Sequence, residues 1–460
     1  MSDAPLTGGD GLPGDADVVL VRTGIYHDSV ALMRVSRALT ELPGTEVAIV
    51  AMATELNLAL ARDLRFELPP AGPSDLLVAI RGHDAQAAAR ELDRLLAALS
   101  SSRTGAAAAD QPPLTTKSAA RRPADMVLVS VPGEHAFAEA LDAVHAGLPV
   151  MIFSDGVSVE REVLLKRLAE ERGVLVMGPD CGTAVIAGAG LGFANVLRPG
   201  PVGVVAASGT GAQQVTSLLD LAGTGVSHVL GVGGRDLSAE VGGLSTVRAL
   251  RLLDDDPATE LIVLVSKPPA PEVARAVREV VETLRTPVVS ALLGERDLTW
   301  AAEEALRALG RSVPEWPAWP GWSGKAVTGT VQGVYSGGTL CTEARLIVGR
   351  GEFVDYGDDA YTLGRAHPMI DPALRLEALA KAAPGDVVLM DIVLGHAADP
   401  DPAASFAHAV ARCPATVVVA LVGTEGDPQD LHRQAAALRE AGASVFTSNA
   451  HAARHAKDLT

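Results

Sequence analysis

Two short stretches combine glycine with hydroxyl side chains where an apolar strand should pass into a helix. They are Ser208-Gly209-Thr210-Gly211 and Ser336-Gly337-Gly338-Thr339. The first turn of a helix leaves backbone N–H groups without partners, with the positive end of the helix dipole behind them. Glycine lets a ligand approach closely, and hydroxyl groups add donors. Both stretches predict an anion-binding corner, although serine and threonine could also act there only as helix caps.

A third glycine-rich turn, Gly233-Gly234-Arg235-Asp236, also follows a predicted strand. Arg235 could hold a carboxylate or phosphate through two parallel hydrogen bonds, so it is a candidate catalytic residue. Gly234 is expected to bind substrate beside it. The alternative is an Arg–Asp pair that steadies the turn.

Two histidines lie in predicted loops around the strand that contains Asp391. His367 is a candidate for substrate binding in an irregular segment, and simple turn formation is the alternative. His396 follows the strand at the edge where open α/β sheets collect ligands, so it is the candidate general base. Asp391 is expected to bond the backbone or a helix start. Spacing typical of metal ligands is absent, and no metal site is predicted.

The elements that must position these residues alternate between apolar runs and amphipathic stretches. The hydrophobic fraction is 48% with only 3% aromatics, as buried strands and covering helices require. This pattern predicts an α/β protein with several doubly wound parallel-sheet domains and a small N-terminal α/β domain.

Changes in composition divide the chain into seven expected segments. They are a flexible N-terminus (1–16), the small α/β domain (17–100), a linker (101–124), a truncated Rossmann-like domain (125–199), a flavodoxin-like domain (200–312), a Trp/Pro linker (313–324) and a second flavodoxin-like domain (325–460). The three tryptophans of the Trp/Pro linker predict that ring packing orders it.

Charge and cysteine content exclude several classes of partner. The net charge of −18 repels phosphate backbones and anionic lipid surfaces, so neither nucleic acid nor a membrane is expected. Three widely separated cysteines fit neither a disulfide framework nor a CxxC metal site. The first residues lack the features of an export signal. We therefore expect a cytoplasmic protein whose substrate is a small anion.

Several motifs resemble known proteins. "VMGPDCGTAVIAG", "VGVVAASGTGAQQV", "GVGGRD" and "DDDPATELIVLV" resemble the α subunit of succinyl-CoA synthetase, and "YSGGTLCTEA" resembles the C-terminal domain of its β subunit. Across nearly the full length, the chain is similar to the FdrA family of acyl-CoA-synthetase-like proteins. Its matching blocks include "RTGIYHDSVALMRVSRAL", "GLGFANVLRPG", "HPMIDPALR" and "DIVLGHAADPDPA".

The resemblance implies that two helices face each other and hold a phosphate between the corners at Ser208 and Ser336. It also exposes departures from the succinyl-CoA synthetase pattern. No histidine follows "TPVVSALLG", where that family carries its phosphohistidine, and Ser266-Lys267 replaces the carboxylate that orients it. No cofactor is expected to be required, and CoA or a nucleotide stays open. We predict no autophosphorylation on histidine.

The FdrA resemblance implies a function in allantoin and purine nitrogen catabolism. The expected role is a transferase subunit of the oxamate carbamoyltransferase type, which interconverts carbamoyl phosphate and oxamate with oxalurate and phosphate. Such a subunit would need partner subunits in a hetero-oligomer. The alternatives are an NDP-forming acyl-CoA ligase subunit and a non-catalytic scaffold.

Overall fold

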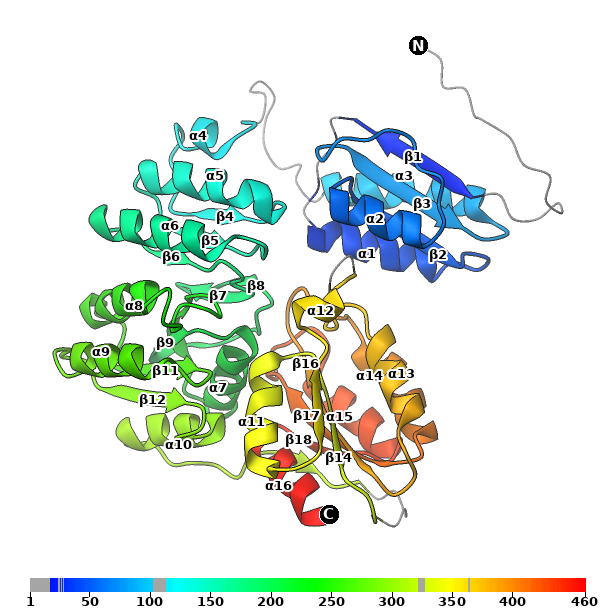
Figure 1. The fold of residues 1–460 in the computed structure, drawn as a ribbon. Coiled ribbons are helices and arrows are strands. Elements are labelled where there is room, and N and C mark those ends of the chain that lie inside the picture. Colours follow the sequence, from blue (N-terminus) through cyan, green and yellow to red (C-terminus); the bar gives the residue numbers. More distant parts are fainter. Residues whose placement is uncertain are drawn as a thin grey trace. The chain divides into compact units, whose positions relative to one another are not determined.

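The computed structural model describes residues 17–23, 25, 27, 29–101, 113–321, 327–362 and 365–460 (Figure 1). The expected flexible N-terminus (1–16), residues 102–112 of the first linker and the start of the last domain at Lys325 lie outside these residues. The chain forms two compact units: the first comprises Met1–Gln111 and Leu363–Ala366, and the second comprises Pro112–Thr362 and His367–Thr460.

The first unit is a three-stranded sheet with helices on both faces. Its elements are β1 (Val18–Arg22), α1 (Ser29–Thr40), β2 (Val47–Met52), α2 (Glu55–Asp63), β3 (Leu76–Arg81) and α3 (Ala85–Ser101). The order is β1-β3-β2, and both pairings are antiparallel. Apolar residues of α1 and α3 cover one face of the sheet, and those of α2 cover the other. The small N-terminal α/β domain is therefore present, with an antiparallel sheet.

The second unit opens with a short parallel sheet. Its elements are α4 (Thr116–Ala119), β4 (Val127–Val129), α5 (Gly133–His145), β5 (Val150–Ile152), α6 (Val159–Glu171) and β6 (Val176–Met177). The strand order is β4-β5-β6, with parallel pairings. Helix α4 falls within the segment that composition assigned to a linker.

The next sheet carries the first corner. It is built from β7 (Thr183–Ile186), β8 (Ala189–Gly192), β9 (Pro199–Ala206), α7 (Gly209–Leu221), β10 (Val226–Gly231), α8 (Leu244–Asp255), β11 (Leu261–Ser266), α9 (Pro271–Val281), β12 (Val288–Leu292) and α10 (Leu298–Ala308). The order is β12-β11-β9-β10-β7-β8. The first four strands are parallel, and β7 and β8 extend the sheet in antiparallel pairings.

The last sheet carries the second corner. Its elements are β13 (Ala318–Trp319), β14 (Val331–Tyr335), α11 (Gly338–Val348), β15 (Glu352–Asp355), α12 (Asp359–Thr362), α13 (Ala373–Lys381), β16 (Val387–Val393), α14 (Pro402–Arg412), β17 (Thr416–Val422), α15 (Leu431–Glu440), β18 (Ser444–Phe446) and α16 (Asn449–Leu459). The order is β13-β18-β17-β16-β14-β15. All pairings are parallel except β13 with β18.

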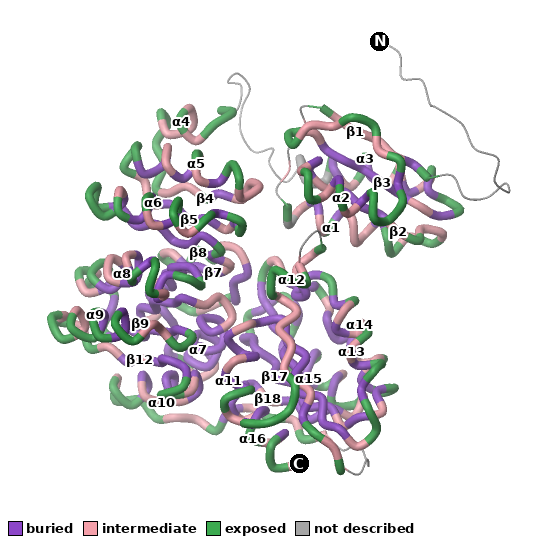
Figure 2. The backbone as a smooth tube through the Cα atoms, viewed as in Figure 1, coloured by how far each residue is buried: buried purple, intermediate pink, exposed green. Residues whose placement is uncertain are grey.

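Helix α7 lies between the last two sheets and is enclosed on every side. Residues Gly211 through Asp220 are all buried, and Figure 2 shows most of the helix in the buried colour. The helix packs against its own sheet, against α10 and α11, and against β17. A surface helix would expose one polar face, so complete burial shows that α7 joins two layers of the unit.

Buried hydrogen bonds fix this junction. The backbone N–H of Asn449 donates to Oε1 of Gln214 over 2.8 Å, and its side-chain Nδ2 donates to Oε2 of Glu343 over 2.7 Å. The other oxygen of Glu343 accepts from the backbone N–H of Leu298. Because buried polar groups are costly without partners, this network favours one arrangement of α7, α10, α11 and α16.

The Trp/Pro linker is ordered where the structure describes it. Trp316 is buried, and its indole N–H donates to Glu303 over 3.1 Å. Trp319 lies in β13 with its ring centroid 5.8 Å from that of His432. The predicted packing is thus present for Trp316 and Trp319, and Trp322 lies outside the described residues.

Among the described helices, none is long and apolar enough to cross a membrane.

Candidate functional site

The two predicted corners meet. Helices α7 and α11 lie side by side in the second unit (Figure 1), and their first turns touch through a reciprocal pair of contacts. A methyl group on Gly337 would lie 2.6 Å from Cγ2 and Oγ1 of Thr210, and one on Gly211 would lie 3.1 Å from Cγ2 of Thr339. Each corner therefore places its threonine on a glycine of the other. A Cβ at Gly337 would force the Thr210 side chain to move, and one at Gly211 would require Thr339 to give by a few tenths of an ångström.

Part of each corner is occupied by the protein itself. Ser208 caps α7, because its Oγ accepts from the N–H of Gly211 over 2.9 Å. At the second corner, Asp391 accepts hydrogen bonds from the N–H and Oγ of Ser336 and from the N–H of Gly337, over 2.7 to 3.0 Å. These donors serve caps and internal partners.

Four backbone amides remain for a ligand. The amides of Gly209, Thr210, Gly338 and Thr339 belong to the first turns of their helices and have no acceptor among the residues that the structure describes. They come from two different layers of the unit. Because both helices direct their positive ends here, the junction favours an anion.

Asp391 forms an ion pair with a buried arginine, Arg375. The Nη2 atom of Arg375 lies 3.1 Å from Oδ1 of Asp391 and also donates to the Asp391 backbone carbonyl. Burial raises the pKa of Asp391, and the guanidinium and the N–H donors of Ser336 and Gly337 oppose that shift. The expectation that Asp391 bonds the start of a helix is confirmed. This pair fixes the backbone of the second corner.

Two charged residues that the sequence motifs did not indicate flank the second corner. Lys267 follows β11, and Asp355 ends β15. A methyl group on Gly338 would lie 3.0 Å from Nζ of Lys267 and would collide with the Asp355 carboxylate. Burial raises the pKa of Asp355 to about 6, against the lowering effect of the Gly357 N–H and of Lys267. Their positions at the carboxyl ends of parallel strands are the signal that could have found them.

More acidic side chains lie within electrostatic range. Asp180 is exposed, yet the surrounding protein removes enough water to raise its pKa to about 6. Asp155 and Asp359 add to this rise, and Lys267 and Arg235 oppose it. These carboxylates therefore place substantial negative charge around the junction, and Lys267 adds a positive charge among them.

The predicted His367 lies beside the second corner. It is half-buried, its ring centroid lies 5.3 Å from that of Phe193, and its Nδ1 accepts from the N–H of Met369. A methyl group on Gly357 would lie 3.0 Å from His367 Nε2 and 3.2 Å from Asp355 Oδ1. Burial lowers the pKa of His367 to about 4, so the ring is neutral near pH 7 and presents an Nε2–H donor.

Arg235 and Gly234 take a more structural position. The guanidinium of Arg235 forms an ion pair of 2.9 Å with Glu162 and donates to the Val157 carbonyl. The Arg–Asp pair foreseen as an alternative does not form. Asp236 instead accepts from Lys166 over 2.7 Å and from the start of α8. A methyl group on Gly234 would lie 3.8 Å from Asp180, so this turn borders the acidic group.

His396 is exposed in the loop after β16. Its backbone N–H donates to the Ala194 carbonyl over 2.7 Å and so joins two segments of the unit. Its role as a general base remains a prediction.

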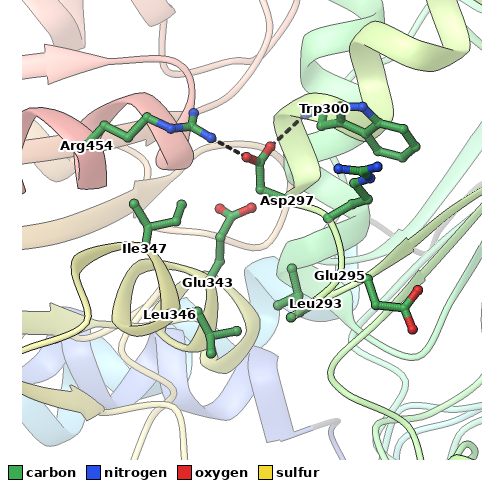
Figure 3. Close-up of a pocket in the computed structure, with 10 residues that line it drawn as sticks. Leu293, Glu295, Asp297, Trp300, Glu343, Leu346, Ile347 and Arg454 are labelled. Carbon is green, nitrogen blue, oxygen red and sulfur yellow. Dashed lines mark hydrogen bonds and ion pairs between the residues drawn. The ribbon is translucent and has the colours of Figure 1, made fainter.

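The loop that lacks the expected histidine lines a cavity of about 400 Å³. Figure 3 shows Asp297 bonded to both Arg454 and Trp300, with Glu343 directed toward the same space. Burial raises the pKa of Glu343 to about 7, and the Asp297 charge contributes to the rise. The guanidinium of Arg296 lies 5.0 Å from the Trp300 ring centroid. The loop from Gly294 to Asp297 thus lies where the resemblance to succinyl-CoA synthetase would place a phosphohistidine.

Three family models match the chain. Residues 198–291 match the CoA binding domain, and residues 334–459 match CoA-ligase. The two corners fall within these ranges. Residues 16–113 match the AllF heavy metal-associated domain. That stretch contains no cysteine, and the described residues hold no group of three or more His, Cys, Asp or Glu that could bind a metal. It therefore lacks the thiolates that soft metals prefer.

One relative matches almost the whole chain. The uncharacterized protein YahF of Escherichia coli K12 is 34% identical over 506 residues, which cover 96% of this chain and 98% of YahF. Succinate–CoA ligase [ADP-forming] subunit alpha 2 of Archaeoglobus fulgidus is 31% identical over 31% of this chain and 50% of its own. Malate–CoA ligase subunit alpha of Methylorubrum extorquens is 27% identical over 34% of this chain and 53% of its own. The chain thus spans about half of each ligase subunit.

The expected transferase class is wrong. Several relatives are subunits of CoA ligases, and the C-terminal family model is CoA-ligase. The physical reason is that a phosphate site predicted between two helix N-termini would serve either reaction equally well. Such a site indicates that a phosphate group is bound, but it does not decide which molecule accepts the carbamoyl or acyl group.

Proposed function

The chain belongs to the family of Escherichia coli YahF, which is acyl-CoA-synthetase-like, and from this we propose that it is a subunit of an NDP-forming acyl-CoA ligase. In this proposal, the corners at Gly209 and Gly338 hold the phosphoryl group of an acyl phosphate. The work is shared with partner subunits, as the names of the ligase relatives indicate for those proteins.

One observation carries the proposal. Two helix starts from different layers touch through Thr210 on Gly337 and Thr339 on Gly211, and four amides beside the contact have no acceptor among the described residues. Such amides stabilise negative charge that develops on a leaving phosphate without needing to reorganise.

The missing histidine decides which part of ligase chemistry this chain performs. The loop Gly294-Glu295-Arg296-Asp297 carries no histidine to accept a phosphoryl group. The phosphoryl group therefore stays on the acyl group while the corners hold it. A partner subunit would form the acyl phosphate and NDP from the acid and NTP. CoA, when bound, would supply the thiol that accepts the acyl group as the acyl–phosphate bond breaks, and the thiol proton would leave with the phosphate. The amides then retain the phosphate that leaves.

Isothermal titration calorimetry with inorganic phosphate and with acetyl phosphate tests the proposal. Thr339 is 2% exposed, and Thr339→Val keeps its shape while removing one hydroxyl donor. We expect binding of both anions to the parent chain and weaker binding to Thr339→Val. The matched control is Thr283→Val, at an exposed position just after α9. Absence of binding to the parent, or equal affinities of parent and Thr339→Val, would refute the site.

A further inference from the structure

Lys267 occupies an unusual position for a lysine. It extends from the end of β11 to the first turn of α11, where its Nζ would lie 3.0 Å from a methyl group on Gly338. The positive end of a helix dipole repels a cation. Lys267 is exposed, so water solvates its ammonium group, and an anion at this point would relieve the repulsion by the helix dipole.

No direct protein partner supplies that anion. Within the described part of the chain, Lys267 forms no ion pair with an acidic oxygen within 4.0 Å. Its positive charge lowers the pKa values of Asp355 and Asp180. The carboxylate of Asp355 reaches the same side of Gly338, but it is not closed onto the ammonium.

A second observation is independent of the helix dipoles. Thr339 is 2% exposed, and its hydroxyl has no hydrogen-bond partner among the residues that the structure describes. Its methyl group lies against Gly211 of the other corner. The hydroxyl oxygen is not among the fully enclosed side-chain atoms without a partner, so it keeps access to a ligand at the junction.

We propose that Lys267 is the cation that holds the ligand's phosphoryl group, and that Asp355 takes up a proton when this group binds. The inference rests on the proposed function and assigns the charged residues of the same site. The bound group is a phosphoryl anion, either as free phosphate or on an acyl group. A protonated Asp355 no longer repels the ligand, and the charge of Lys267 then acts on the ligand alone.

Asp355 titrates among several charged or ionisable groups. Those that face it or lie within electrostatic range come from the surrounding strands, helices and loops: Lys267, Cys341, Asp358, His367, Arg375 and Asp391. Arg375 is already paired with Asp391, and His367 is neutral near pH 7. Lys267 is therefore the cation whose partner can change on binding, and phosphate affinity should fall as pH rises through about 6.

Calorimetric titration of the full chain with phosphate and with acetyl phosphate, from pH 5.5 to 8, tests the inference. Loss of a charge-assisted contact predicts a fall in affinity of about 10- to 100-fold for Lys267→Met, and Lys267→Arg should recover most of it. Asp355→Asn should bind more tightly than the parent at pH 8 and lose most of the pH dependence. The matched control is Lys381→Met, whose lysine pairs with Glu377 on α13.

The outcomes separate this inference from the proposed function. If the parent binds neither anion, both fail. If the parent binds them and Thr339→Val weakens binding while Lys267→Met does not, only the role of Lys267 is overturned. An unchanged pH profile in Asp355→Asn overturns the proton uptake. Preference for acetyl phosphate over phosphate would identify the acyl phosphate as the ligand source, and equal affinity would identify free phosphate.

Discussion

Replacing Gly337 by alanine tests directly whether the two corners touch. The new methyl group would lie 2.6 Å from Cγ2 and Oγ1 of Thr210 and 2.8 Å from its Cβ. Non-bonded carbon atoms prefer separations of roughly 3.5–4.0 Å, so one side must move. The backbone adds no penalty, because φ at Gly337 is −119°. We expect a loss of about 1–3 kcal/mol in the free energy of unfolding, as for overpacked cores.

A double-mutant cycle assigns this loss to the contact. Thr210→Gly removes the clashing atoms and by itself should cost about 0.5–1 kcal/mol through chain entropy. The combination with Gly337→Ala should be more stable than the sum of the single variants by roughly 0.5–3 kcal/mol. Gly182→Ala is the control, because its methyl group would meet only Phe193 at 3.9 Å.

Urea unfolding followed by tryptophan fluorescence reports on the correct unit, because all four tryptophans lie between residues 300 and 322. A parent-like midpoint for Gly337→Ala, with an unchanged denaturant slope, would show that the corners do not touch. Additive effects in the cycle would show the same.

Three further predictions follow from other parts of the molecule. With ATP or GTP and magnesium, the chain should gain no acid-labile, base-stable phosphate, and radiolabelled phosphohistidine would refute this. Burial raises the pKa of Glu343 from 4.5 to about 7, so its contribution to stability is complete below pH 4.5 and is lost as pH rises through 7. Glu343→Gln should flatten this part of the stability profile in urea titrations, and a profile as steep as the parent's would contradict the assignment. Arg375→Met leaves Asp391 buried without its cation and should cost about 3–5 kcal/mol in urea unfolding, whereas a loss below about 1 kcal/mol would show that the pair does not hold the corner.

The sequence by itself determined the alternation of strands and helices and the position of both corners. Apolar runs such as Leu261–Ser266, and glycine-rich turns before amphipathic segments, are local signals. They report which residues start a helix, because an N-cap and the residues around it lie within one turn. The α/β class and the place of Ser208 and Gly337 before α7 and α11 could therefore be predicted.

Only the tertiary structure decided how those residues are used. Asp391 accepts hydrogen bonds from the amides of Ser336 and Gly337, although its strand lies more than 50 positions away in the sequence. Arg235 likewise pairs with Glu162 on a helix distant in the sequence. The contact of Thr210 with Gly337 joins the starts of α7 and α11, which follow strands of two separate sheets. Such pairings depend on how the layers pack, and local sequence patterns carry no information about which distant surfaces meet. For the same reason, Lys267 and Asp355 became a candidate pair only once β11 and β15 were seen to end beside the same turn of α11.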